Sequence, residues 1–298
     1  MFGINRVFTR IIWTHSRVNR CQHTSPFPTF RLTIKEDPAM KIEDIMTTKV
    51  IAVGKNDSLT HILELMKKHA ITKLPVMDGK SFIGIVSDNT IAHKLGSIRK
   101  RSICASRLHT SSVTEKNIPF IAPDDDVQDI LRTVGQPGPT MLPVLNGQRL
   151  VGVVTKANLL PLVKSRAPVS SLMQSHIITA APDDRVVHAR RLLIDKNIAR
   201  LPVVTSQKAL VGMISDFEIA IAFAKLKDAP LGHQNRYLEE MLVRDAMRSP
   251  VIWAQPQLPA AVAAETMNRH NIGSLPILDR DRLIGMVTRT DLLRTIQL

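Results

Sequence analysis

One phrase occurs four times in this chain, and this repeat constrains the fold more than any other feature. Each copy has Leu-Pro, a short apolar and turn stretch, then Gly, two apolar residues, and Ser or Thr. The copies are LPVMDGKSFIGIVS (74–87), LPVLNGQRLVGVVT (142–155), LPVVTSQKALVGMIS (201–215) and LPILDRDRLIGMVT (275–288). From the Pro to the later Gly the spacing is 9, 9, 10 and 9 residues. A repeat of this kind predicts four similar supersecondary units in series.

The surroundings of the phrase repeat as well. Three copies follow a similar opening motif, namely IEDIMTTKVIAV (42–53), VSSLMQSHIITA (169–180) and VRDAMRSPVIWA (243–254). In the second copy the corresponding element is less similar to the others and has the sequence SSVTEKNIPFIA (111–122). An amphipathic helix is predicted between motif and phrase. In the first copy Asn56-Asp57-Ser58 offers a cap, and the apolar residues at helical spacing are Leu59, Ile62, Leu63, Met66 and Ala70.

The phrase itself reads as a strand, a turn and a return strand, with Asp78-Gly79 or Asn146-Gly147 at the turn. A second helix is predicted to start near Ser87 and its counterparts. The unit is therefore strand–helix–strand–strand–helix, an α+β fold, and about 60 residues are few for independent stability. Two units packed together would bury each other's apolar faces.

Assuming that neighbouring repeats pair, we expect a first pair at 40–165 and a second pair at 169–298. The polar connector 225–241 then lies within the second pair. The repeats are expected at about 40–96, 103–165, 169–226 and 242–298.

Composition excludes several classes of protein. The chain has 298 residues, 44% of them hydrophobic and 4% aromatic, which is enough apolar material for packed domains. No run of about 18 apolar residues is present, so no membrane span is expected. Two cysteines, Cys21 and Cys104, supply neither a disulfide framework nor a four-cysteine zinc site.

The formal net charge is +14, and residues 1–39 contribute +4 of it. This segment has no clean helical or alternating period. It reads as a disordered or non-native extension before Met40. A transit peptide is the alternative, since such peptides are rich in Arg and Ser and poor in acids.

The four phrases, together with openings such as Asp44-Ile45-Met46-Thr47 and Asp245-Ala246-Met247, resemble the cystathionine β-synthase (CBS) domain. The resemblance covers about 255 residues, taken from the bounds of the two pairs, 40–165 and 169–298. It implies four CBS repeats arranged as two Bateman modules. It also implies adenosine-type ligands (AMP, ADP, ATP or S-adenosylmethionine) bound in clefts between paired repeats, and regulation of an attached or partner protein.

The family's ligand motif is Gly, two apolar residues, Ser/Thr, any two residues, then Asp. The carboxylate can accept both hydrogens of a ribose diol, and the hydroxyl three residues earlier can meet ribose or phosphate oxygens. The four copies end in Ser87/Thr90, Thr155/Asn158, Ser215/Glu218 and Thr288/Asp291. We therefore expect the second pair to bind the nucleotide. A capping box, which needs no ligand, is the alternative explanation for each copy.

Other site residues follow from the resemblance. Arg200, directly before Leu201-Pro202, matches a position where family members often carry an Arg that faces phosphate; Lys73 is its equivalent in the first repeat. The adenine pocket is expected among apolar residues of the openings, with Thr179, Ala180, Ile252 and Trp253 as candidates. A core position is the alternative for Trp253.

We expect a regulatory adenosyl-ligand sensor that is not an enzyme, needs no cofactor or metal, and signals to a partner protein. A homodimer in the cytoplasm is expected, or in an organelle if residues 1–39 are a transit peptide. Nucleic-acid binding through the positive charge is an alternative, although no helix-turn-helix, zinc finger or RNP-type phrase is present. An enzyme is a weaker alternative, because the repeats fill the chain and no Walker loop or hydrolase motif appears.

Overall fold

The computed structural model describes residues 40–97, 105–134, 141–227 and 240–296, and these belong to one compact unit. The predicted extension 1–39, Cys104 and residues 228–239 of the connector lie outside the described residues. None of the helices in the described ranges combines the length and the apolar character that a membrane span requires.

The first pair contains repeats 1 and 2. The elements of repeat 1 are α1 (Ile42–Ile45), β1 (Val53–Gly54), α2 (Leu59–His69), β2 (Lys73–Asp78), β3 (Ser81–Ser87) and α3 (Asp88–Ser97). A short helix η1 (Ala105–Arg107) precedes repeat 2. The elements of repeat 2 are η2 (Thr110–Ser112), α4 (Val127–Val134), β4 (Met141–Asn146), β5 (Arg149–Thr155), α5 (Lys156–Leu159) and η3 (Leu160–Leu162).

The second pair contains repeats 3 and 4. The elements of repeat 3 are η4 (Val169–Ser171), α6 (Val186–Asp195), β6 (Arg200–Val204), β7 (Leu210–Ser215) and α7 (Asp216–Lys227). The elements of repeat 4 are α9 (Val243–Ala246), α10 (Ala260–Arg269), β8 (Ser274–Asp279), β9 (Arg282–Thr288) and α11 (Arg289–Leu293). The α+β class and the four-repeat architecture are confirmed.

Each phrase forms an antiparallel hairpin, and the turn glycines predicted in the first two copies have the left-handed backbone that such turns need. β2 pairs with β3 from Lys73↔Ser87 to Asp78↔Ser81, and Gly79 occupies the turn with φ of +60°. The helix before the hairpin is also as predicted. Ser58 caps α2 by accepting a hydrogen bond of 3.2 Å from the His61 amide, and Met66 is fully buried.

The opening segments tie the repeats of each pair together. The first part of each opening adds to the hairpin of the other repeat, as in the antiparallel bridges Thr47↔Val153 and Gln174↔Met286. The later part runs parallel to its own hairpin, as in Ala180↔Val203. Because each repeat completes the sheet of its neighbour, the pair is the smallest unit that can bury its own edges.

The Gly that recurs in every phrase has a packing role that the sequence alone did not reveal. A Cβ added at Gly152 would lie 2.6 Å from the Met46 sulfur, and Gly212 and Gly285 face Met247 and Met173 in the same way. Each Met is the one in the opening motif of the partner repeat. The two motifs are therefore complementary parts of one contact.

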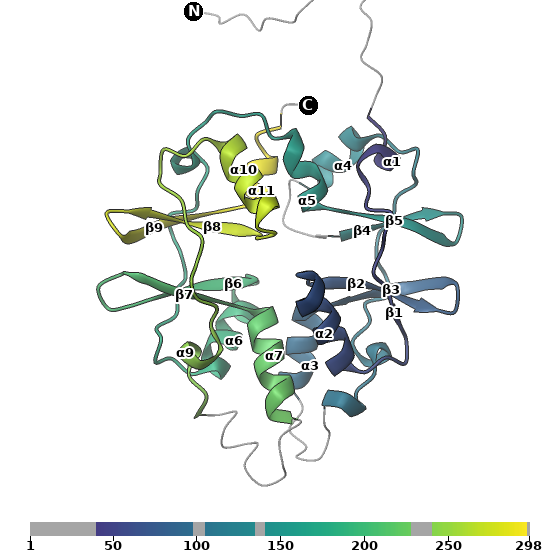
Figure 1. The fold of residues 1–298 in the computed structure, drawn as a ribbon, viewed down its shortest axis with the longest axis horizontal. Helices are drawn as coiled ribbons and strands as arrows, with labels where there is room; N and C mark the ends of the chain where they lie inside the picture. Colours follow the sequence, from purple (N-terminus) through teal and green to yellow (C-terminus); the bar gives the residue numbers. More distant parts are fainter. Residues whose placement is uncertain (1–39, 98–104, 135–140, 228–239, 297–298) are drawn as a thin grey trace, which may run out of the picture. The chain divides into compact units, whose positions relative to one another are not determined.

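The two pairs pack so that repeat 1 lies against repeat 3 and repeat 2 lies against repeat 4. One continuous core joins helices of repeat 1 to helices of repeat 3, and a second core joins repeats 2 and 4. Figure 1 shows the hairpins of repeats 1 and 3 in the lower half and those of repeats 2 and 4 in the upper half. The helices α10, α11 and α5 lie above the upper hairpins, and α7 and α3 lie below the lower hairpins. The helices α3 and α7 lie against each other and carry the first of these contacts.

Candidate functional site

The end of each phrase forms a local cap in the structure. In repeat 4, Asp291 Oδ2 accepts hydrogen bonds from the Thr288 amide (2.9 Å) and from Thr288 Oγ1 (2.7 Å). In repeat 3, Glu218 Oε2 accepts from the Ser215 amide at 3.0 Å and from Ser215 Oγ. The capping box expected as the alternative is thus present, and a ligand would have to use the remaining capacity of these carboxylates.

Asp291 lies in a positively charged setting. It is 6% exposed, and its Oδ1 lies 3.7 Å from Nη1 of Arg294. Lys156, from the first pair, reaches the same helix and donates to Thr290 Oγ1 at 2.7 Å. Burial, helped by Arg294, lowers the pKa of Lys156, and Asp291 acts in the opposite direction. Thr288 and Asp291 are brought together as predicted, and the sequence did not indicate that Lys156 would join them.

Arg200 shares its surroundings with Ser215 and Glu218. Its Nη1 makes one long hydrogen bond, 3.5 Å to Ser274 Oγ, with no other hydrogen-bond partner among the described residues. Burial lowers the pKa of Arg200, while the nearby carboxylates of Asp88 and Glu218 act in the opposite direction. A guanidinium has five donors, so Arg200 retains capacity for an anion.

In the first pair, the side chains that replace the carboxylates of Asp291 and Glu218 form hydrogen bonds within the pair itself. The Asn158 amide donates to the Ile45 carbonyl at 2.9 Å and to Thr47 Oγ1 at 3.1 Å. The Thr90 hydroxyl donates a hydrogen bond of 2.9 Å to the Ser87 carbonyl. Neither side chain carries a carboxylate, and weaker binding by this pair stays a prediction.

The adenine candidates lie in different settings. Ala180 is 2% exposed and belongs to the core of repeats 1 and 3, and Thr179 beside it is half-buried. Ile252 packs against the core of repeats 2 and 4. Trp253 is 46% exposed, so the structure does not place it in the core.

Two surface hollows accompany these residues. One, of about 330 Å³, has Trp253 on its wall together with β7 and the opening of repeat 4; it is lined by Ala209, Leu210, Val211, Ser249, Pro250, Val251, Trp253, Leu278 and Asp281. The other, of about 400 Å³, surrounds Asn158 and reaches Asn268 of α10 in the second pair. In the part of the chain that the structure describes, no group of three or more His, Cys, Asp or Glu side chains is arranged to hold a metal.

An acid pair lies where the two pairs of repeats meet. Asp88 and Asp216 are the first residues of α3 and α7, and Asn89 Nδ2 donates to Asp216 Oδ2 at 3.1 Å. Burial, together with the Asp216 carboxyl, raises the pKa of Asp88 to about 7, against the opposing effects of Lys73 and Arg200. Burial also raises the pKa of Asp216.

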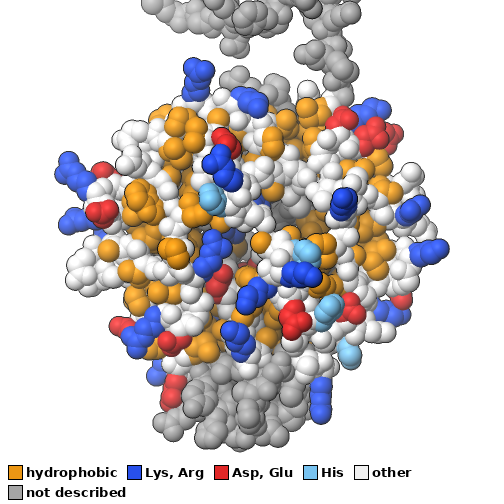
Figure 2. Space-filling view, in the orientation of Figure 1, with side chains coloured by type: hydrophobic (Ala, Val, Ile, Leu, Met, Phe, Trp, Pro, Cys, Tyr) orange, Lys and Arg blue, Asp and Glu red, His pale blue; other side chains and the backbone are white. Residues whose placement is uncertain are grey.

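Figure 2 shows Lys and Arg side chains near the middle of the face that it draws.

Asp88→Asn is therefore expected to change how stability depends on pH. A carboxyl whose folded pKa is raised favours folding below its unfolded pKa of 3.8, and this contribution disappears as pH rises through about 7. We expect wild type and variant to be similar near pH 4. At pH 8 the variant should be more stable by on the order of 2 kcal/mol. Urea unfolding at several pH values measures this.

Asp279→Asn, at an exposed carboxyl, is the control for that experiment. Parallel pH profiles for wild type and Asp88→Asn would contradict the assignment of an acid pair.

Comparison with known proteins agrees with this architecture. The family model "CBS domain" matches residues 42–97, 111–165, 169–225 and 243–298. Protein MJ1225 of Methanocaldococcus jannaschii, proposed as an archaeal homologue of g-AMPK, has a crystal structure similar to this chain. The TM-score is 0.75 at 22% identity, over 87% of this chain and all of that one.

Curated relatives match over different lengths. The uncharacterised protein MJ1404 of the same organism is 26% identical over 86% of this chain, which spans 61% of that protein. A homoserine O-acetyltransferase of Methanohalobium evestigatum is 34% identical over 45% of this chain, and the match covers 25% of that enzyme. The family matches and the fold agree, and we conclude that the chain belongs to the CBS-domain family, with four CBS domains arranged as two Bateman modules.

Proposed function

We propose that this protein is a regulatory sensor whose second pair of CBS domains binds an adenosine-type ligand, namely AMP, ADP, ATP or S-adenosylmethionine. The observation that carries the proposal is that only one of the two carboxylate oxygens of Asp291 is used by the cap. One carboxylate oxygen holds the cap on Thr288, and the other lies 3.7 Å from Arg294, which is longer than a hydrogen bond. That second oxygen retains the capacity to accept the hydrogens of a ribose diol.

The second pair has further chemistry that suits such a ligand. Glu218 repeats the carboxylate of Asp291 in the neighbouring repeat, and Arg200 retains donors for a phosphate. Thr179, Ala180, Ile252 and Trp253 stay our candidates for the apolar surroundings of the adenine. A guanidinium with unused donors favours an anionic group such as phosphate, and a carboxylate with an unused acceptor favours hydroxyl donors such as those of a ribose.

Substitution of Asp291 tests the site. Asp291→Asn preserves an acceptor for the Thr288 cap, as Asn158 does in repeat 2, but it removes the ionised acceptor. A hydrogen bond to a charged group contributes about 1.5–3 kcal/mol. We therefore expect AMP affinity, measured by isothermal titration, to fall by about tenfold or more.

Asp279→Asn removes a carboxylate at an exposed position and is the matched control, so it should bind AMP as wild type does. Equal affinity of wild type and Asp291→Asn would refute the assignment of Asp291. Failure of wild type to bind any adenosine compound below a millimolar dissociation constant would refute the proposed function.

A regulatory role requires that the ligand bind two conformations with different affinity and that a partner protein distinguish them. The partner, the absence of catalysis and the cytoplasmic or organellar location stay predictions. The homodimer is also a prediction. The helices of the two modules already cover one another within one chain. Light scattering on the purified chain measures the assembly.

A further inference from the structure

The two halves of the interface between the modules carry opposite charges at one position of the phrase. The residue directly after the Ser or Thr is Asp88 in repeat 1 and Asp216 in repeat 3, but Lys156 in repeat 2 and Arg289 in repeat 4. Because repeats 1 and 3 share one core and repeats 2 and 4 share the other, the acids lie in one half and the bases in the other. The half that contains Asp291 is thus the one with a base at this position.

Lys156 crosses the boundary between the modules. It begins α5 of the first module, it is 5% exposed, and its ammonium donates to the hydroxyl of Thr290, the neighbour of Asp291. The helix α5 packs directly against α11, which carries Thr290 and Asp291. A side chain of one module is therefore built into the ligand motif of the other.

The charge balance around Lys156 favours an added anion. Lys156 and Arg294 both lie beside the carboxylate of Asp291, and one oxygen of that carboxylate already serves the Thr288 cap. Burying an ammonium beside a second cation costs free energy unless a negative group accompanies it. A phosphate ester on the ribose would supply that charge, whereas the sulfonium of S-adenosylmethionine would add another positive charge.

We propose that Lys156 of the first module completes the Asp291 site of the second and makes that site select phosphate-bearing adenosine ligands over uncharged or sulfonium-bearing ones. This inference rests on the proposed function. It narrows the ligand class to adenine nucleotides, and it makes ligand binding depend on contact between the two modules, since one phosphate contact comes from the first module and the ribose contact from the second.

The test compares AMP with adenosine, which lacks only the phosphate, by isothermal titration of the full chain. For Lys156→Met we expect AMP affinity to fall about tenfold or more, while adenosine affinity stays within about threefold of wild type. Retained adenosine binding also shows that the variant is folded. Lys156→Arg should restore most of the AMP affinity. Lys164→Met, at an exposed lysine shortly after α5, is the matched control and should change neither affinity.

Three outcomes overturn the inference. Equal losses of AMP and adenosine affinity in Lys156→Met would assign Lys156 a purely structural role. Unchanged AMP affinity would remove it from the site, and in both cases the proposed function stands because wild type binds. Wild type that binds neither AMP nor adenosine would instead refute the proposed function and this inference with it.

Discussion

Gly84→Ala is expected to destabilise the chain by about 3 kcal/mol or more, because overpacking and backbone strain each cost about 1–3 kcal/mol. Gly84 lies in β3 with φ of +153°. A Cβ there would be 2.7 Å from Thr114 Cγ2 and closer still to the Glu115 carbonyl oxygen. The backbone cannot move away easily, since Ile85 and Glu115 exchange two hydrogen bonds of 2.9 Å.

The control for Gly84→Ala is Gly79→Ala, in the turn of the same hairpin. Gly79 has φ of +60° and no atom within 4 Å of an added Cβ. Its substitution should cost only the left-handed backbone penalty, about 1–2 kcal/mol. Denaturant unfolding gives both values. A loss at Gly84 no larger than the loss at Gly79 would contradict the close approach of repeats 1 and 2.

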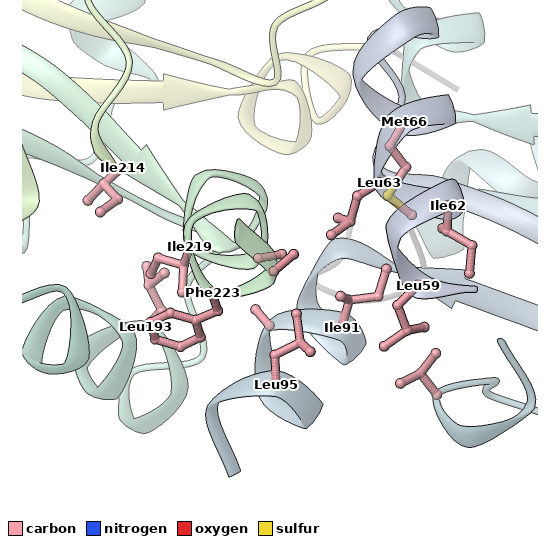
Figure 3. Close-up of a cluster of buried hydrophobic side chains, with 14 of the residues drawn as sticks. Leu59, Ile62, Leu63, Met66, Ile91, Leu95, Leu193, Ile214, Ile219 and Phe223 are labelled. Atoms are coloured by element: carbon pink, nitrogen blue, oxygen red, sulfur yellow. The ribbon is translucent and has the colours of Figure 1, made fainter. Parts of the chain in front are cut away.

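Phe223→Ala is expected to cost about 3–5 kcal/mol of unfolding free energy, as full truncation of a buried Phe does. Phe223 is 1% exposed on α7 of the second module, and its core also contains Ile91 and Leu95 of the first. Figure 3 shows the three side chains in one cluster with Leu193 and Ile219. The cavity would lie between the modules, so both modules should lose stability together in one transition.

Phe120→Ala removes the same side chain at a position that is 64% exposed. It should change the unfolding free energy by no more than about 0.5 kcal/mol. Similar losses for Phe223→Ala and Phe120→Ala, or separate transitions for the two modules, would contradict the shared core.

The repeat predicted most of the fold, because each phrase specifies its own hairpin and the preceding apolar residues specify a helix. It could not predict which repeats face each other across the modules. Their helices present similar apolar faces, and the matching is decided by contacts such as Arg190, whose Nη2 donates to the His93 carbonyl at 3.1 Å. One signal was present: α7 reads DFEIAIAFAKLK, which is apolar nearly all round and typical of a helix covered on all sides.

The candidate site was less predictable than the fold. The pairing of Thr288 with Asp291 follows from their spacing of three residues. Lys156 lies 135 residues before Asp291, so only the packing of α5 on α11 brings them together. The same is true of Asp88 and Asp216, whose opposition depends on the contact between α3 and α7.

A crystal structure of the chain grown with AMP tests the central claim most directly. We predict the nucleotide between the two repeats of the second module, with the ribose hydroxyls on Asp291 and the phosphate near Lys156. Nucleotide bound only in the first module, beside Asn158 or Thr90, would contradict the account, as would an empty second module at saturating AMP.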